Sequence, residues 1–538
     1  MSSQAIRITQ VSAGSAAAGV AALGAGALVA VAPIAAPGAL ILGSVGAWVW
    51  ARPHVAAYLI IGITPLVGGI DRGTLFPLLR PNEALAVFLA GVLTTRALIY
   101  WPSGKKFRIN LHPLEKAFVG LAVTSSIVPV IWALARGNTL NGDDISYAMV
   151  LWKFLGVYAL VRLTVKTQAQ LYRCLQISIV AALIVALIGI GQVMGKITEN
   201  SFPMSLYVPE GHLDTTADGP RASSTLTLPA ATADLLVFNL VLALGLFFKK
   251  VRGYGLYALA AAIFVVGTFA AGEFSSVIGL LIGVITVAFA LRMPRLLMGM
   301  PFVGAFAVVA MWPVVSSRLS GFASVHGLPT SWIGRLHNLE TYFWPQLWHG
   351  PNILLGVRPS ARVPVAGEIT GFVWIESGYT WLLWGGGIPL FVAFIWFTYV
   401  VLRTTYTQMQ IGGQYTQVAA LGGFVAMIVI VGLMMFDPHL TYRGSADCFF
   451  ALLALTVALR TRGDPPIPDQ GGDNPAHDSN TEIQGRKANA GSSEARGAVA
   501  HARAAHHGGD VADGGGGTRG RPVREPAVRV GLPSGGAT

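Results

Sequence analysis

The sequence is poor in charged residues and in cysteine. Only 12% of its 538 residues are charged, about half of the fraction found in soluble globular proteins, which excludes an ordinary soluble domain. Its two cysteines, Cys174 and Cys448, lie at the end of one apolar run and inside another, which argues against a disulfide framework. The first apolar run begins near Val11 and has no clear processing site, so we expect no cleaved signal peptide.

Hydrophobic residues are abundant and come in long runs. They make up 53% of the chain, the mean hydropathy is +0.60, and the runs have the roughly 17–25 residues that cross a bilayer core. The sequence therefore predicts an all-α polytopic membrane protein with about fourteen (12–14) transmembrane helices. The expected spans are 11–32, 38–51, 54–70, 82–101, 114–135, 146–165, 171–195, 227–249, 253–271, 274–292, 296–315, 378–403, 414–436 and 443–460.

Basic residues fix the expected orientation, because loops on the cytoplasmic side are enriched in lysine and arginine. With an even number of spans, alternate connections carry nearly all the lysines, so we expect both termini to be cytoplasmic and the protein to lie in the plasma (inner) membrane. These connections hold Arg52, Lys105, Lys106, Arg108, Lys166, Arg173, Lys249, Lys250, Arg252, Arg292, Arg295, Arg403, Arg460 and Arg462.

The ends of the chain differ from its middle. Residues 1–10 form a short cytoplasmic N-terminus, 11–460 the membrane domain, and 461–538 a tail rich in Gly, Pro, Asp and Ala. A tail of this composition buries no core, so we expect it to be disordered in the cytoplasm. It carries as many basic as acidic residues, which leaves the net charge of +12 in the membrane portion. We therefore expect no nucleic-acid partner.

Two polar loops, 196–226 and 316–376, interrupt the apolar runs on the expected outer side. The longer one holds Arg318, Arg335, Arg358 and Arg362 but no lysine. Arginine binds phosphate groups bidentately, whereas lysine acts as a point charge. The loop is therefore expected to hold a phosphate or pyrophosphate ligand; lipid-headgroup contacts or ordinary salt bridges are the alternative.

Two patterns place arginines beside possible anion sites. Arg221 precedes a Ser/Thr-rich turn that opens the span at 227–249, where free backbone N–H groups favour an anion. In the long loop, Trp332, Leu336, Leu339, Phe343 and Leu347 recur at helical spacing. They predict an amphipathic helix that lies on the membrane surface or covers a cavity. Arg335 at its start points into that cavity or stays exposed.

Three ionisable residues fall inside or at the end of predicted spans: Lys153, Asp234 and Glu83. Such residues are costly in a membrane unless they are paired or line a cavity. We expect Lys153 and Asp234 to pair with each other or to line the path of a ligand, with Glu83 in the same group.

Several motifs together resemble the O-antigen ligase/polymerase superfamily of bacterial membrane glycosyltransferases. The first motif is Arg221 before the Ser/Thr-rich turn that opens the span at 227–249. The others lie in and after the long loop: Gly334-Arg335, Leu354-Leu355-Gly356-Val357, Glu376-Ser377-Gly378-Tyr379 and 382–389. The resemblance implies a GT-C-like helical core, no metal or cofactor, and a glycan donor on undecaprenyl pyrophosphate. It places the functional arginines at Arg221 and Arg335, with Arg318 and Arg358 as further candidates.

The chain departs from the ligase pattern at three places. Glu376-Ser377 stands where the ligase pattern has His-Asn, Leu228-Pro229 replaces Asn-Pro, and 272–276 replaces a Ser-Arg pair. Glu376 is expected to take the proton of an acceptor hydroxyl, or else to cap a helix or pair with a base; Glu368 and Asp218 are the next candidates for the proton acceptor. These differences favour a polysaccharide polymerase.

The expected reaction joins lipid-linked oligosaccharide repeats at the outer face, with membrane lipids around the enzyme and export or chain-length-control proteins as further partners. A ligase acting on a lipid or protein acceptor is the first alternative. An exporter of polysaccharide or lipid carrier is the second, but such transporters show related halves, and no repeat relates 11–250 to 251–460.

Overall fold

The computed structural model describes residues 36–75, 79–100, 111–198, 204–207, 221–320, 330–365 and 371–459. These residues belong to one unit, which ends at Asp464. The predicted N-terminus, the first predicted span, the tail at 461–538, and residues 199–203, 208–220, 321–329 and 366–370 of the two polar loops lie outside the described residues, as do Asp218 and Glu368.

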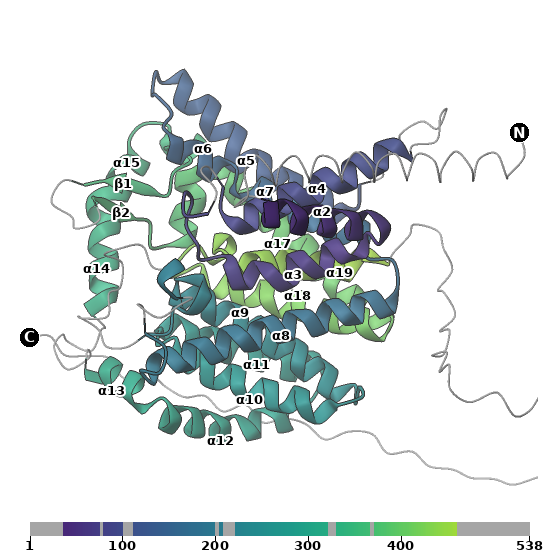
Figure 1. Cartoon of the computed structure of the whole chain (residues 1–538). Coiled ribbons are helices and arrows are strands. Elements are labelled where there is room, and N and C mark those ends of the chain that lie inside the picture. Colours follow the sequence, from purple (N-terminus) through teal and green to yellow (C-terminus); the bar gives the residue numbers. More distant parts are fainter. Residues whose placement is uncertain are drawn as a thin grey trace, which may run out of the picture. The chain divides into compact units, whose positions relative to one another are not determined.

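The protein is an α-helical membrane protein. Among the described residues, seven helices are long and apolar enough to cross a membrane, and five shorter apolar helices accompany them. Every predicted span after the first falls mainly on helical residues, although the span at 296–315 is broken by a bend of 89° between Ala310 and Trp312. The number of crossings stays a prediction. The first elements (Figure 1) are α2 (Ala36–Ala51), α3 (His54–Val67), α4 (Pro81–Ile99), α5 (Pro113–Ala135), α6 (Gly142–Ala148), α7 (Val150–Thr164), α8 (Gln168–Val193), and the short η1 (Met204–Leu206) and η2 (Ser224–Leu226).

The core is made by three helices, one from the middle of the chain and two from near the end of the described residues. Helices α9 (Pro229–Phe248), α18 (Gln414–Leu433) and α19 (Ser445–Ala458) contact one another and bury side chains around their whole circumference, as expected of a helix enclosed by others. Close approach depends on small residues: a Cβ at Gly422 would lie 2.6 Å from Leu242 Cδ2. The remaining helices between α9 and the long loop are α10 (Tyr254–Ala270), α11 (Phe274–Ala290) and α12 (Arg295–Ala310).

The long predicted loop is largely structured, and it begins later than expected. Helix α13 (Trp312–Ser320) follows α12 after a bend of 89°, so Arg318 lies in a helix. The amphipathic stretch forms α14 (Thr330–Asn338), the π-helical turn η3 (Leu339–Phe343) and α15 (Trp344–Trp348). The second half of its apolar face is buried at Leu339, Phe343 and Leu347, whereas Leu336 is 48% exposed.

The all-α prediction is confirmed, and one short hairpin in the long loop is the exception among the described residues. Strands β1 (Arg362–Pro364) and β2 (Phe372–Trp374) pair antiparallel, with Val363 opposite Val373. Three-residue strands are too short to show an alternating pattern, so periodicity does not reveal them. The hairpin extends to Ile375, whose N–H donates to the Ala361 carbonyl at 3.0 Å.

Helix α17 (Gly378–Ile411) anchors the long loop to the membrane core. It is kinked at Gly387 (φ 65°), just before Pro389, where α16 (Asn352–Leu355) packs so closely that a Cβ on Gly387 would lie 2.4 Å from the Leu354 carbonyl oxygen. The Val357 N–H donates to the Trp384 carbonyl at 2.7 Å. The Leu354–Val357 motif and the glycine run at 385–387 therefore pack against each other.

Helix α17 also runs beyond the predicted end at 403. Its polar residues Thr404, Thr405 and Gln408 are each buried, so one face stays packed although the sequence turns polar. The predicted span at 378–403 therefore lies inside a longer helix, whose end hydropathy alone does not reveal.

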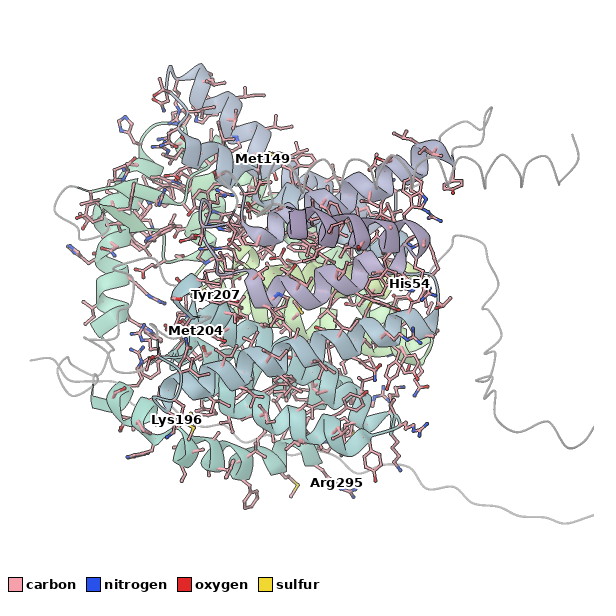
Figure 2. The ribbon with its side chains drawn as sticks, in the orientation of Figure 1. His54, Met149, Lys196, Met204, Tyr207 and Arg295 are labelled. Atoms are coloured by element: carbon pink, nitrogen blue, oxygen red, sulfur yellow. The ribbon has the colours of Figure 1, made fainter. Side chains whose placement is uncertain are left out.

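The connections between helices meet at two opposite ends of the bundle. Elements α6, α13, α14, α15 and the β-hairpin lie together at one end (Figure 1). Figure 2 places Lys196, Met204 and Tyr207 toward that end, and His54 and Arg295 toward the other. Which end faces the cytoplasm stays a prediction.

Candidate functional site

Arg335 is the centre of a charged group at the end of the helices where the long loop lies. Its Nη1 lies 3.0 Å from Asp437 Oδ2 and its Nε lies 3.6 Å from Glu376 Oε1. Helix α14 supplies the arginine, the segment before α17 supplies Glu376, and the α18–α19 connection supplies Asp437. Burial opposes the charge of Arg335, but Asp437 and Glu376 outweigh it and raise the pKa of the guanidinium.

Glu376 is held between two anchored elements. The hairpin fixes the backbone before it, and the Oγ of Ser377 accepts the Thr380 N–H at 3.3 Å, so Ser377 caps α17. The alternative that Glu376 caps the helix is therefore wrong, whereas its pairing with a base is observed. Asn338 Nδ2 donates to Glu376 Oε2 at 3.5 Å. Burial raises the pKa of Glu376, and Arg335 opposes that rise.

Arg221 belongs to the same group through Glu273. Its Nη1 lies 3.1 Å from Glu273 Oε1, in the turn between α10 and α11. Burial raises the pKa of Glu273, against the charges of Arg221 and then Arg335. Glu273 is thus within electrostatic range of both arginines, which brings together the two loops that the sequence singled out.

Arg318 contacts the same turn, next to Glu273. Its Nε donates to the Gly272 carbonyl at 2.7 Å. Gly272 has φ +67°, and a Cβ there would lie 2.7 Å from Val314 Cγ1 of α13. The turn at 272–273 therefore needs glycine both for its conformation and for its packing. We call Arg221, Arg318, Arg335, Glu273, Glu376 and Asp437 the loop cluster.

Asp234 and His439 form a buried pair beside the loop cluster. His439 Nδ1 lies 2.7 Å from Asp234 Oδ2, with side-chain exposures of 1% and 3%. Within the described residues, His439 Nε2 has no hydrogen-bond partner. The centres of the Tyr442 and His439 rings lie 4.8 Å apart.

The expected pairing of Lys153 with Asp234 is wrong. Lys153 Nζ lies 3.8 Å from Asp447 Oδ2 because α7 packs against α19, and Asp234 on α9 instead meets His439. Glu83 pairs with Arg72, whose Nη2 lies 3.1 Å from its Oε1. All three predicted ionisable residues are therefore paired, as the cost of burial requires.

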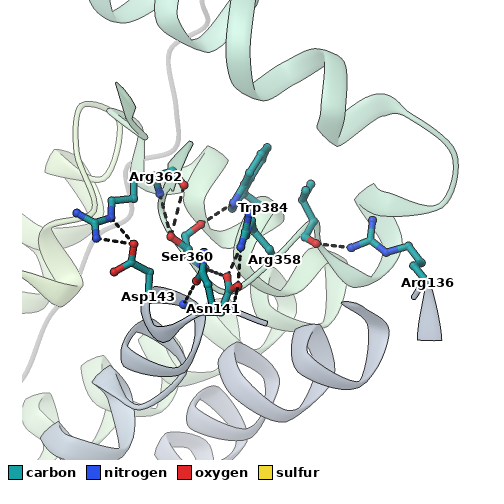
Figure 3. A network of polar contacts seen from close by, with 9 residues as sticks. Arg136, Asn141, Asp143, Arg358, Ser360, Arg362 and Trp384 are labelled. Carbon is teal, nitrogen blue, oxygen red and sulfur yellow. Dashed lines mark hydrogen bonds and ion pairs between the residues drawn. The ribbon is translucent and has the colours of Figure 1, made fainter. Parts of the chain in front are cut away.

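Arg358 lies in a separate network with an acidic helix start (Figure 3). Its Nε and Nη2 donate to the two carboxylate oxygens of Asp144 at 2.9 and 2.5 Å, and the Ser360 N–H donates to the same carboxylate at 3.2 Å. Arg362 donates to Asp143 with its Nε at 2.8 Å and lies over the ring of Phe372. These contacts fasten the hairpin to α6.

Among the described residues, no ion pair or hydrogen bond joins Arg358 to the loop cluster. The structure thus brings Arg221, Arg318, Arg335 and Glu376 together and places Arg358 with the fastening contacts.

No protein-family model matches this sequence, and no curated protein matches it at a significant level. The function proposed below therefore rests on the contacts described above and on the motifs that resemble the glycosyltransferase superfamily.

Sequence reasoning missed Asp437 and His439. Both lie in the short connection between α18 and α19, two helices that contain no other histidine and only one further acidic residue, Asp447. Charged residues between two apolar spans are a usable signal of a functional site. Their relation to Arg335, however, depends on a contact between segments far apart in the chain, which periodicity does not report.

Proposed function

We propose that this protein is a membrane glycosyltransferase that polymerises oligosaccharide repeats carried on a polyprenyl pyrophosphate, at the outer face of the plasma membrane. The observation that carries the proposal is the convergence of three arginines from separate segments at one end of an apolar helix bundle. Arg221 and Arg318 contact the turn at 272–273, and Arg335, which is within electrostatic range of Glu273, pairs with Glu376. The motif resemblance supports the same reaction class.

In the proposed reaction, the bond between the anomeric carbon of the donor glycan and the pyrophosphate oxygen breaks. A bond forms from that carbon to a hydroxyl oxygen of the acceptor glycan, whose proton passes to Glu376. The polyprenyl pyrophosphate leaves with the bonding electrons, and the arginines of the loop cluster stabilise its charge. A raised carboxylate pKa makes Glu376 a better proton acceptor near neutral pH.

The ion pairs within the loop cluster fit such a cycle. Arg335 pairs with Asp437 and Glu376, and Arg221 with Glu273. A pyrophosphate that takes the place of a carboxylate partner of Arg335 releases Glu376 to act on the acceptor. Asp437 is 6% exposed and pairs with Arg335 at the shorter distance, so we assign it to positioning the guanidinium.

The function is tested by the glycolipids that accumulate when the protein is removed from its cell. A polymerase leaves single repeats on polyprenyl pyrophosphate at the outer face. Full-length chains on the carrier contradict the proposal in favour of a ligase, and repeats trapped on the cytoplasmic face contradict it in favour of an exporter.

The proposed role of Glu376 predicts an acid limb in the pH dependence of chain extension. The reactive form is the carboxylate, and burial raises its pKa. Activity is therefore expected to fall as the pH drops through this raised pKa, which lies above the value of about 4.3 typical of a free glutamate. Initial rates measured against pH report this limb.

Glu376→Gln is expected to remove most activity across the whole pH range. Glu340→Gln is the matched control, because Glu340 is exposed on η3 of the same loop and makes no contact in the loop cluster. An unchanged acid limb in the Glu376→Gln variant would show that another group accepts the proton.

A further inference from the structure

A second group of charged side chains lies on the other side of the α18–α19 connection. Four bases meet three acids: Arg72 Nη2 is 3.1 Å from Glu83, Arg443 Nη1 is 3.3 Å and Arg80 Nη2 is 3.6 Å from Asp71, and Lys153 Nζ is 3.8 Å from Asp447. We call these seven residues the α4 cluster. With four basic and three acidic side chains, the cluster has an excess of one positive charge.

Two bases of the α4 cluster, Arg80 and Lys153, have unused donors, whereas Arg72 donates to Glu83 and to the Ser146 hydroxyl. Arg80 Nε is buried and has no hydrogen-bond partner among the described residues. Lys153 reaches Asp447 only at 3.8 Å, beyond hydrogen-bond distance, and its ammonium lies 4.3 Å from the Phe154 ring. Asp71 is shared by two arginines. Burial, followed by the charges of Arg443 and Arg72, lowers the pKa of Arg80 to about 10.

Buried donors without acceptors are costly, and an anion with several oxygens would satisfy them. Arginines in forked geometry together with a lysine are the side chains that bind phosphate groups. The α4 cluster therefore has the chemistry of a phosphate-binding site.

The position of the cluster points to a ligand that comes from the membrane. Arg80 is the residue before the first turn of α4, and α4 is mostly exposed, with only 11% of its span buried. Leu75, Leu79 and Val87 are exposed apolar side chains on and beside it. A phosphate in the cluster can therefore carry a hydrocarbon chain that lies along α4.

The α4 cluster and the loop cluster share the connection between α18 and α19. Asp437 in the α18–α19 connection pairs with Arg335, and Arg443, six residues later, pairs with Asp71. Ligands in the two clusters are thus held on either side of the same connection.

We propose that the α4 cluster binds the pyrophosphate of the acceptor, a second polyprenyl-linked glycan, while the loop cluster binds that of the donor. The identity of this ligand rests on the proposed polymerase function, in which both substrates are lipid-linked. A ligase that transfers to an acceptor without pyrophosphate has no need of the second site.

Native mass spectrometry of the purified full-length protein, titrated with farnesyl pyrophosphate, tests the proposal. The wild-type chain is expected to bind two molecules. The double variant Arg80→Gln/Arg443→Gln is expected to bind one, with the lost step weakened by more than about tenfold. Arg96→Gln is the matched control, because it removes a charge from the opposite end of α4. Thermal unfolding of each variant in detergent verifies that it is folded.

The outcomes separate this proposal from the function on which it rests. A wild-type chain that binds one molecule, or a double variant that still binds two, overturns the acceptor site. Displacement of one molecule by an equal concentration of dioleoyl phosphatidylglycerol also overturns it, since the cluster is then an ordinary headgroup site. If Arg335→Ala keeps both molecules while the double variant loses one, the acceptor site stands and the donor assignment fails.

Discussion

Replacing Arg335 with alanine is expected to slow chain extension by about 10²–10³-fold, because its guanidinium is the member of the loop cluster that contacts both Glu376 and Asp437. This is the usual loss when one preorganised group that stabilises developing charge is removed. Arg335→Lys is expected to recover little activity, since an ammonium lacks the planar fork that binds a phosphate group bidentately. Initial rates of oligomer formation by purified variants measure both effects.

Arg362→Ala is the matched control for Arg335→Ala. Both arginines lie in the long loop, with side-chain exposures of 25% and 20%, but Arg362 contacts the hairpin and Asp143 and not the loop cluster. Its loss is expected to change the rate by less than about tenfold, or 1.4 kcal/mol in activation free energy. The donor-site assignment is wrong if the two variants lose activity equally.

Breaking the pair between Arg358 and Asp144 is expected to destabilise the protein rather than to abolish the reaction. Asp144 is 1% exposed and receives three hydrogen bonds from Arg358 and Ser360. Asp144→Ala removes the partner of a partly buried arginine, and we expect a loss of about 3 kcal/mol, the low end for such pairs, because Arg358 is partly screened by solvent. Denaturation in detergent measures this loss.

The double variant Asp144→Ala/Arg358→Ala distinguishes the two roles of Arg358. If the arginine only fastens the hairpin to α6, the double variant is expected to be no less stable than Asp144→Ala, and its rate per folded molecule to remain near that of the wild type. A hundredfold loss of rate at unchanged stability would instead place Arg358 in the pyrophosphate site, as the sequence predicts.

The sequence predicts the helices well because the bilayer sets a length for apolar runs. It fails where packing replaces hydropathy as the determinant. Helix α17 continues past Arg403 because Thr405 and Gln408 are buried against neighbours. Helix α13 carries Arg318 past the predicted start of the loop because the chain bends by 89° and stays helical.

The candidate site is only half predictable for the same reason. Arg221, Arg335 and Glu376 stand out as polar residues in loops between apolar spans. Their partners Asp437 and Glu273 lie in short turns, and the contacts that join them form only when four segments meet. Conversely, Arg358 has the same sequence signature as Arg335, and only its contact with Asp144 distinguishes the two.

The most direct test of the proposed function uses the lipid-linked repeats extracted from cells that lack this protein. The purified protein is reconstituted into liposomes with these repeats, and the lipid-linked products are separated by length. We predict a ladder of two, three and more repeats, with one polyprenyl pyrophosphate released for each new bond. Repeats that stay single, or that pass only to an acceptor other than a second lipid-linked repeat, would contradict the polymerase.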